Sequence, residues 1–412
     1  MKGQDIITSK SKKLTSYIGP GTLVTAAFIG PGTITTCIRI GIENRYALLW
    51  AVVFATLSTI ILQETAARIG IVTQNGLGEN IHSLFNSRIL RCFAIVLVFS
   101  SILIGNCAFE TGNITGVSIG LQMIFPNISG VLCSIVICAL SLLMINFVKF
   151  KNVQRILVIC VFLMSIVFLT LAIASQPTIS DLHEGIDKIS LGKGGLMNIL
   201  GLIGTTIGPY GLFLHSYAAS KKWSNPEDIK HSNIDTIISI SIGGIITAAI
   251  IIVSAASVEN DKIISVSYVS DLTDNLVLKW GYWTKYLLSV GLILAGFSSC
   301  LTAPIGAAVA TQGICGISSD FTKKYTRILA SSVVIAGTFF SILWGASPTQ
   351  LILFAQIINA VILPLIASFL LICANSKRMG KYKNTPLQNI EGVIVIVLCV
   401  LICIRNIVNI IT

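Results

Sequence analysis

Residues 28–34 read FIGPGTI and interrupt a long apolar segment near the start of this 412-residue chain. A second apolar segment contains a matching interruption at residues 206–212, which read TIGPYGL. Proline removes a backbone donor and its ring clashes with the preceding helical turn, while glycine adds conformational freedom that a helix must lose. Because both segments carry Ile-Gly-Pro near their middle, we predict a broken helix at each position. Two ordinary proline kinks are the alternative. The matched tripeptides favour broken helices, because two unrelated kinks would not need the same three residues.

The composition indicates a protein that lies in a membrane. Hydrophobic residues make up 54% of the chain, charged residues only 11%, and the mean hydropathy is +0.87. A soluble domain carries about 25% charged residues. A bilayer core needs about 20 apolar residues per helix, and we predict an all-α protein with eleven such spans, at about 17–41, 46–73, 90–116, 129–148, 154–175, 197–218, 235–258, 283–315, 327–346, 349–374 and 391–411.

The charge distribution predicts the orientation. With a cytoplasmic N-terminus, the inner segments hold 19 of the 28 Lys and Arg residues, as the positive-inside rule requires of short loops. The C-terminus then lies outside. We therefore interpret the net charge of +11 as membrane sidedness and expect no nucleic-acid partner. Residues 1–16 contain no apolar run of the kind that a removable signal peptide needs, and we expect a monomer in the lipid bilayer of the bacterial inner membrane.

Other classes of protein find little support in the sequence. The eleven cysteines include no CxxC pair and read as small hydrophobic residues rather than as disulfides or a zinc site. The chain has no HExxH motif and only four histidines. We expect neither an enzyme nor a bound cofactor.

Paired helix breaks in corresponding spans are typical of secondary transporters, because unwound backbone at membrane depth is tolerated where it lines a cavity. We predict one transmembrane domain, 1–412, of the leucine-transporter type. Its 5+5 inverted repeat would comprise 1–175, with the N-terminal tail, and 176–375. The eleventh helix, 376–412, would be appended. Substrate would bind where helices one and six cross, and alternating access would move it.

Four sequence motifs carry a resemblance to a known family. Residues 62–73 read LQETAARIGIVT, residues 214–216 read LHS, residues 295–299 read AGFSS, and residues 379–384 read MGKYKN. In this order and spacing the chain resembles the natural resistance-associated macrophage protein (Nramp) family of divalent metal transporters. The resemblance extends over almost the whole chain, and it implies metal transport that is proton-coupled in typical members.

The predicted site departs from the family pattern. Typical members carry Asp-Pro-Gly-Asn in helix one and Met-Pro-His in helix six, where this chain has GPGT at 30–33 and GPY at 208–210. A carboxylate supplies charge and a thioether favours softer ions such as Mn²⁺ over Mg²⁺. Without them, a metal would meet backbone carbonyls near Gly30 and Gly208 and the Thr33 hydroxyl. Glycine at both breaks would also leave a wider cavity.

These residues leave two hypotheses for the substrate. The first is a hard divalent cation such as Mg²⁺, which keeps several waters and prefers oxygen ligands. The second is a small organic solute, an amino acid or carboxylate, held by the amides at the half-helix N-termini. For either substrate the predicted binding residues are Gly30, Thr33, Gly208, Tyr210, Gly211 and Gln356, the last of which aligns with a helix-ten glutamine of the family.

A proton route is implied by the resemblance at Glu110, His215 and Arg327. Intramembrane carboxylates are costly and usually functional, although Glu110 could instead bind a neighbouring backbone donor. His215 could relay protons or be satisfied within the bundle, and Arg327 could be a snorkelling anchor. Tyr210 stands where the family has a histidine and is a poor acid or base at neutral pH, which weakens the case for proton coupling.

Overall fold

The computed structural model describes residues 19–178, 180, 196–258, 268–343 and 362–411, and within them the chain forms helices joined by turns, with no strand. Seven of the described helices are long and apolar enough to cross a membrane, and a bent helix pair makes an eighth. The predicted all-α membrane fold is confirmed. The predicted count of eleven spans is not, because span six is two short helices and the first half of span ten lies outside the described residues.

The helices of the first half are α1 (Pro20–Phe28), α2 (Pro31–Asn44), α3 (Leu49–Thr73), α4 (Leu77–Leu84), α5 (Arg88–Ile124), α6 (Gly130–Phe147) and α7 (Phe150–Ala174). Those of the second half are α9 (Leu196–Thr206), α10 (Pro209–Lys222), α11 (Ile229–Ser257), α12 (Tyr268–Trp280), α13 (Trp283–Ile314), α14 (Lys324–Leu343) and α16 (Pro386–Ile411). An apolar helix at Ile362–Ala374 and two 3₁₀ turns, η2 (Pro226–Asp228) and η3 (Lys377–Tyr382), complete the described chain.

Both predicted helix breaks are present. Helix α1 ends at Phe28, α2 begins at Pro31, and the two are bent by 56°. Helix α9 ends at Thr206 and α10 begins at Pro209. Each proline occupies the first position of the second helix, where its missing N–H would have no helical partner and its fixed φ suits the helical turn. The Ile-Gly-Pro stretches therefore act as a stop and a restart, and not as kinks within continuous helices.

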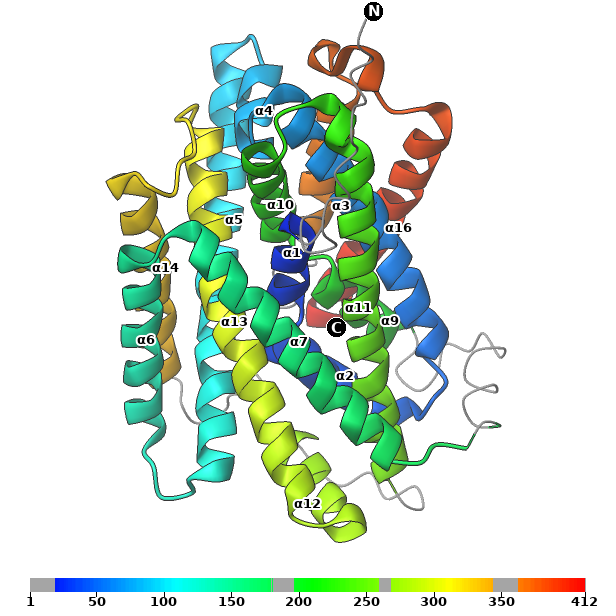
Figure 1. The fold of residues 1–412 in the computed structure, drawn as a ribbon. Helices are drawn as coiled ribbons and strands as arrows, with labels where there is room; N and C mark the ends of the chain where they lie inside the picture. The colour runs from blue at the N-terminus through cyan, green and yellow to red at the C-terminus, as the bar shows by residue number, and fades with distance from the viewer. Residues whose placement is uncertain (1–18, 179, 181–195, 259–267, 344–361, 412) are drawn as a thin grey trace, which may run out of the picture.

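The broken helices lie in the middle of the bundle (Figure 1). Helices α1 and α10 contact each other, and α13 packs against both. Helices α5, α6 and α14 gather on one side of this centre, with α3, α11 and α16 on the other. Helix α13 is the most enclosed of the spans, with 83% of its most apolar window buried. Its glycines let neighbouring helices approach closely, α7 at Gly291, α5 at Gly296 and α10 at Gly306, as expected for helices in lipid.

The outer surface of the bundle is apolar. Leu143 and Phe147 on α6 and Phe162 and Ile173 on α7 are exposed, and only 28% of the α6 window is buried. Water would penalise such a surface, whereas lipid tails solvate it. The chain is an integral membrane protein.

Asp235 of α11 fixes the start of α1. Its two carboxylate oxygens accept hydrogen bonds from the backbone N–H groups of Gly19 and Gly21, each at 2.8 Å. A Cβ on Gly21 would lie 2.7 Å from the Asp235 carbonyl oxygen, so only glycine allows this approach. A carboxylate at a helix N-terminus satisfies unpaired donors and opposes the positive end of the helix dipole. The first half of the broken span is therefore anchored to α11.

Candidate substrate site at the helix breaks

Three backbone carbonyls leave the helical ladder at the first break. In a continuous helix, the carbonyls of Ala26, Ala27 and Phe28 would accept hydrogen bonds from the N–H groups four residues later. Pro31 has no N–H, so the Ala27 carbonyl can have no helical partner. The last regular helical bond before the break runs from Ile29 N–H to the Thr25 carbonyl. Buried carbonyls of this kind need another donor.

Side-chain hydroxyls supply those donors. The Tyr210 hydroxyl donates to the Ala27 carbonyl at 2.6 Å, and the Thr33 hydroxyl donates to the Phe28 carbonyl. The Ala26 carbonyl accepts from Ser298 at 3.3 Å and from Ser299 at 3.4 Å. The donors come from α2, α10 and α13, so three elements converge on the open end of α1.

Tyr210 joins the two breaks directly. Its side chain is 1% exposed, and its ring meets Phe109 of α5 edge to face, with 5.7 Å between the ring centres. On its other side a Cβ on Gly306 of α13 would lie 2.9 Å from the ring. The residue after Pro209 thus reaches across to the carbonyl that Pro31 leaves open. The two breaks face each other, as the sequence predicted.

The predicted wider cavity is absent at Gly30, because neighbouring side chains occupy the space. A Cβ on Gly30 would lie 2.8 Å from the Ser299 hydroxyl and 3.4 Å from Asn113 Oδ1. At Gly208 a Cβ would lie 3.4 Å from the Tyr210 ring. Glycine leaves a cavity only where no neighbouring side chain fills the space. Here the Ser299 hydroxyl and the Asn113 amide fill the space at Gly30, and the Tyr210 ring fills it at Gly208.

Glu110 is linked to the first break by one intervening side chain, that of Asn113. Its side chain is completely buried, and Oε2 accepts from Asn113 Nδ2 at 3.3 Å. Oε1 has no hydrogen-bond partner among the described residues. Gly337 of α14 packs against the Glu110 side chain, where a Cβ would lie 2.6 Å from Cγ. The structure therefore places Glu110 beside the site, in contact with α14.

Gly211 and His215 lie on the face of α10 that meets α3. His215 is completely buried, and its Nδ1 lies 3.1 Å from Gln63 Oε1. A Cβ on Gly211 would lie 3.4 Å from Gln63 Nε2. His215 Nε2 has no hydrogen-bond partner in the described part of the chain. One ring nitrogen is thus fixed by α3, and the other is buried without a partner among the described residues.

One predicted residue, Arg327, is not brought to this site. Arg327 donates to the carbonyls of Asn146 at 2.7 Å and Phe321 at 3.3 Å, so it ties the end of α6 to the turn before α14. Ten residues separate it from Gly337, about 15 Å along a helix. These contacts favour the anchor interpretation of Arg327. Gln356 lies outside the described residues.

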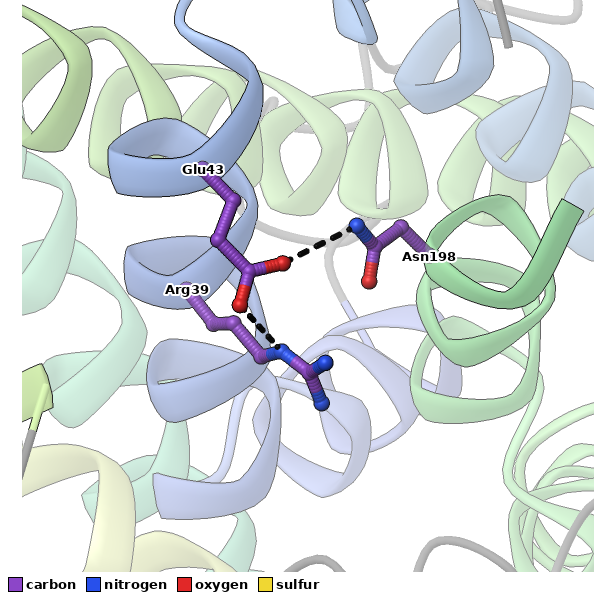
Figure 2. A network of polar contacts seen from close by, with 3 residues as sticks. All are labelled: Arg39, Glu43 and Asn198. Atoms are coloured by element: carbon purple, nitrogen blue, oxygen red, sulfur yellow. Dashed lines mark hydrogen bonds and ion pairs between the residues drawn. The ribbon is translucent and has the colours of Figure 1, made fainter. Parts of the chain in front are cut away.

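A polar link connects α2, the second half of one broken span, with α9, the first half of the other (Figure 2). Arg39 Nε lies 2.9 Å from Glu43 Oε1 on α2, and Asn198 of α9 donates to Glu43 Oε2 at 3.2 Å. The three side chains point toward one another between the two helices. The Arg39 charge is therefore compensated within α2.

A separate cavity of about 690 Å³ lies between α3, the start of α11 and the start of α16. Its wall carries both signs of charge, with Glu64, Arg68, Lys230 and Glu391 among its residues. Arg68 donates to Gln388 at 2.8 Å and also to Asn384. The motif at 62–73 and the motif at 379–384 therefore meet here, away from the breaks.

Sequence reasoning did not assign the hydroxyls of Ser298 and Ser299, the Asn113 amide or Gln63 to the site. The available signal was small polar residues inside apolar spans, two of which stand in the AGFSS motif and one in the motif at 62–73. Among the described residues no three His, Cys, Asp or Glu side chains are grouped as metal ligands. The site therefore offers neutral oxygen atoms.

Several known proteins share the sequence and the fold of this chain. The divalent metal cation transporter MntH of Staphylococcus saprophyticus is 26% identical over 95% of this chain and 91% of its own. Metal transporter Nramp3 of Oryza sativa is 27% identical over 93% of this chain and 72% of its own. The Eremococcus coleocola manganese transporter, solved with an aromatic bis-isothiourea substituted compound, superposes with a TM-score of 0.77 at 26% identity, covering 99% of this chain and 88% of that one.

The shared fold reaches beyond these relatives. Mhp1, a nucleobase-cation-symport-1 family transporter solved in a closed conformation, matches with a TM-score of 0.54 at 13% identity, over 95% of this chain and 92% of that one. This likeness concerns the fold alone. The family described as natural resistance-associated macrophage protein-like matches residues 21–409. The chain is thus a membrane transporter of the leucine-transporter type and belongs to the Nramp family.

Proposed function

We propose that this protein is a secondary transporter of a hard divalent cation, of which Mg²⁺ is the type. The relatives named above are transporters of divalent metals or manganese, which supports a metal as the substrate class. The observation that carries the proposal is the oxygen lining of the first break, where the carbonyls of Ala26, Ala27 and Phe28 meet hydroxyl groups. Neutral oxygen ligands with few charges suit a cation that keeps part of its water shell.

The described residues at the break include no thioether or thiolate ligand, which supports a hard cation over Mn²⁺ or Fe²⁺. A thioether or thiolate would favour those ions, and Gly208 stands where typical family members have methionine. Gly30, Thr33 and Gly208 would contact the cation through carbonyl and hydroxyl oxygens. Glu110 would supply the compensating charge through Asn113, which donates to the Glu110 carboxylate and lies against Gly30.

Coupling to protons would involve Glu110 and His215. Both side chains are completely buried, and each retains one polar atom without a partner among the described residues. A carboxylate that binds a proton in one state and balances a cation in the other couples the two flows. This part of the proposal predicts uptake that depends on the pH gradient.

Transport would proceed by alternating access. The repeats would be 1–175 and 176–375, with 376–412 appended, and the N-terminus would be cytoplasmic and the C-terminus outside, in the bacterial inner membrane. Release of α1 from Asp235 would open the inner side, and separation of α2 from α9 at Glu43 and Asn198 would open the outer side. The working unit would be a monomer.

Uptake into proteoliposomes tests the proposal. Reconstituted protein would be given Mg²⁺, Mn²⁺, Ca²⁺ and an amino-acid panel, with and without an inward proton gradient. We expect saturable Mg²⁺ uptake that other solutes fail to match, and stimulation by the gradient. Uptake of Mn²⁺ that excess Mg²⁺ does not inhibit, or uptake of amino acids without any metal, would contradict it.

A further inference from the structure

The Ala27 carbonyl is the acceptor at the break that most needs a donor from outside its own helix. Proline four residues later removes its helical donor, and the carbonyl is buried with α10 and α13 around it. A carbonyl in this position is what an oxygen-seeking cation would bind first. In this structure the Tyr210 hydroxyl holds it instead, at 2.6 Å.

We propose that Tyr210 is a built-in competitor for the substrate and sets the affinity of the site. The phenol donates to the Ala27 carbonyl while the site is empty of cation, and an arriving divalent cation displaces it. When the cation leaves, the phenol returns and satisfies the carbonyl again. This inference rests on the proposed function, because it takes the cation to bind at the first break.

The surroundings of the ring allow this exchange. A buried carbonyl must always have a partner, and the phenol and the cation can fill that role in turn. Glycines flank the ring at Gly208 and Gly306, the edge of Phe109 meets it with 5.7 Å between ring centres, and the small side chains of Ala27 and Ala303 pack in the same cluster. The Glu110 carboxylate lies near the phenol, and the Thr302 hydroxyl of α13 hydrogen-bonds with it. The phenol therefore keeps a partner on α13 when a cation takes the Ala27 carbonyl.

Removal of the Tyr210 hydroxyl changes the cation affinity in opposite directions, depending on whether the phenol competes with the cation or binds it. If the phenol competes, loss of its hydroxyl strengthens cation binding by roughly the worth of one net hydrogen bond, about fivefold. If the phenol oxygen instead binds the cation, its loss weakens binding. The sign of the change in affinity therefore decides between the two roles.

The experiment titrates purified wild-type protein, Tyr210→Phe and Tyr217→Phe with Mg²⁺ in a calorimeter, and measures Mg²⁺ uptake by each. Tyr217 is a matched control, because it is a buried tyrosine on the same helix whose hydroxyl accepts from Phe321 N–H at 3.0 Å. We expect Tyr210→Phe to lower the Mg²⁺ dissociation constant and the Michaelis constant about fivefold, with no rise in maximal rate. Tyr217→Phe should leave both constants unchanged.

An unchanged or weakened affinity in Tyr210→Phe, with wild-type protein that binds Mg²⁺, would overturn the competitor role and leave the proposed function intact. Wild-type protein that neither binds nor transports a divalent cation would instead contradict the proposed function itself. Should Tyr210→Phe fail to fold, Phe109→Leu provides the second test. It loosens the ring while keeping the hydroxyl, and it should raise Mg²⁺ affinity by a smaller factor; a fall in affinity would overturn the inference.

Discussion

The two helix breaks share Ile-Gly-Pro but present different polar groups. The break after Phe28 presents acceptors, since three carbonyls there lie outside the helical ladder and are met by hydroxyls. The break after Thr206 presents a donor, because the residue after its proline is Tyr210. The shared tripeptide determines where the helices stop, and the residues next to it determine which polar groups the break presents. Helix ends and the chemistry of the break are therefore encoded by different positions of the same short motif.

The largest expected effect comes from blocking the first break. A Cβ on Gly116 of α5 would lie 2.3 Å from the Pro31 ring, so Gly116→Val should push α2 away from α5. We expect complete loss of uptake and a loss of stability of roughly 3 kcal/mol, in line with overpacked cores. Uptake and thermal unfolding of the purified protein measure the two effects.

Gly201→Ala on α9 is the control, because its Cβ would meet Thr36 at an ordinary 3.7 Å. It should keep uptake and gain slightly in stability from helix propensity. Full uptake by Gly116→Val would show that the contact between α5 and the break does not matter for transport.

Removing the Glu110 charge should abolish coupling without unfolding the protein. In Glu110→Gln the hydrogen bond from Asn113 can persist while the titratable group is lost, so the dependence of uptake on the proton gradient should disappear. Glu64→Gln is the comparison, since Glu64 lines the separate cavity near α16. Gradient-dependent uptake in Glu110→Gln equal to that of the wild type would exclude Glu110 from the proton route.

A smaller effect is expected at the anchor of α1. Asp235→Asn keeps the size of the side chain but weakens its bonds to Gly19 and Gly21, and loss of a charged helix cap costs about 1 kcal/mol. We expect a lower unfolding temperature, together with easier opening of the inner side. Asp228→Asn, in the turn before α11, provides the control. Equal unfolding temperatures for Asp235→Asn and wild type would contradict the anchoring role.

The smallest effect is expected at the link between α2 and α9. Arg39 is about one-third exposed, and ion pairs of this kind contribute at most about 1 kcal/mol. Replacing Glu43 by Gln keeps one acceptor for Asn198, so we expect little change in stability. A double-mutant cycle of Arg39→Gln and Glu43→Gln, read by chemical unfolding, measures the coupling. A coupling above about 2 kcal/mol would show that this link is stronger than a surface pair.

The breaks could be predicted from sequence because proline and glycine act locally. The burial of Glu110 and His215 followed from their place inside apolar spans. The contacts that define the site were beyond prediction, since Tyr210 and Ala27 are 183 residues apart and Ser298 and Ala26 are 272 apart. The expectation of a wider cavity at Gly30 failed for the same reason, as Ser299 fills the space from α13.

On the proposed function the substrate cation binds between the two breaks. Anomalous diffraction from crystals grown with Mn²⁺, which has an anomalous signal and substitutes for Mg²⁺ at oxygen sites, locates that cation. We predict a peak beside the Ala27 carbonyl, at a metal–oxygen distance of about 2.1 Å, with the Tyr210 hydroxyl moved off that carbonyl. A peak confined to the cavity lined by Glu64 and Glu391, with the Tyr210 hydrogen bond unchanged, would contradict it.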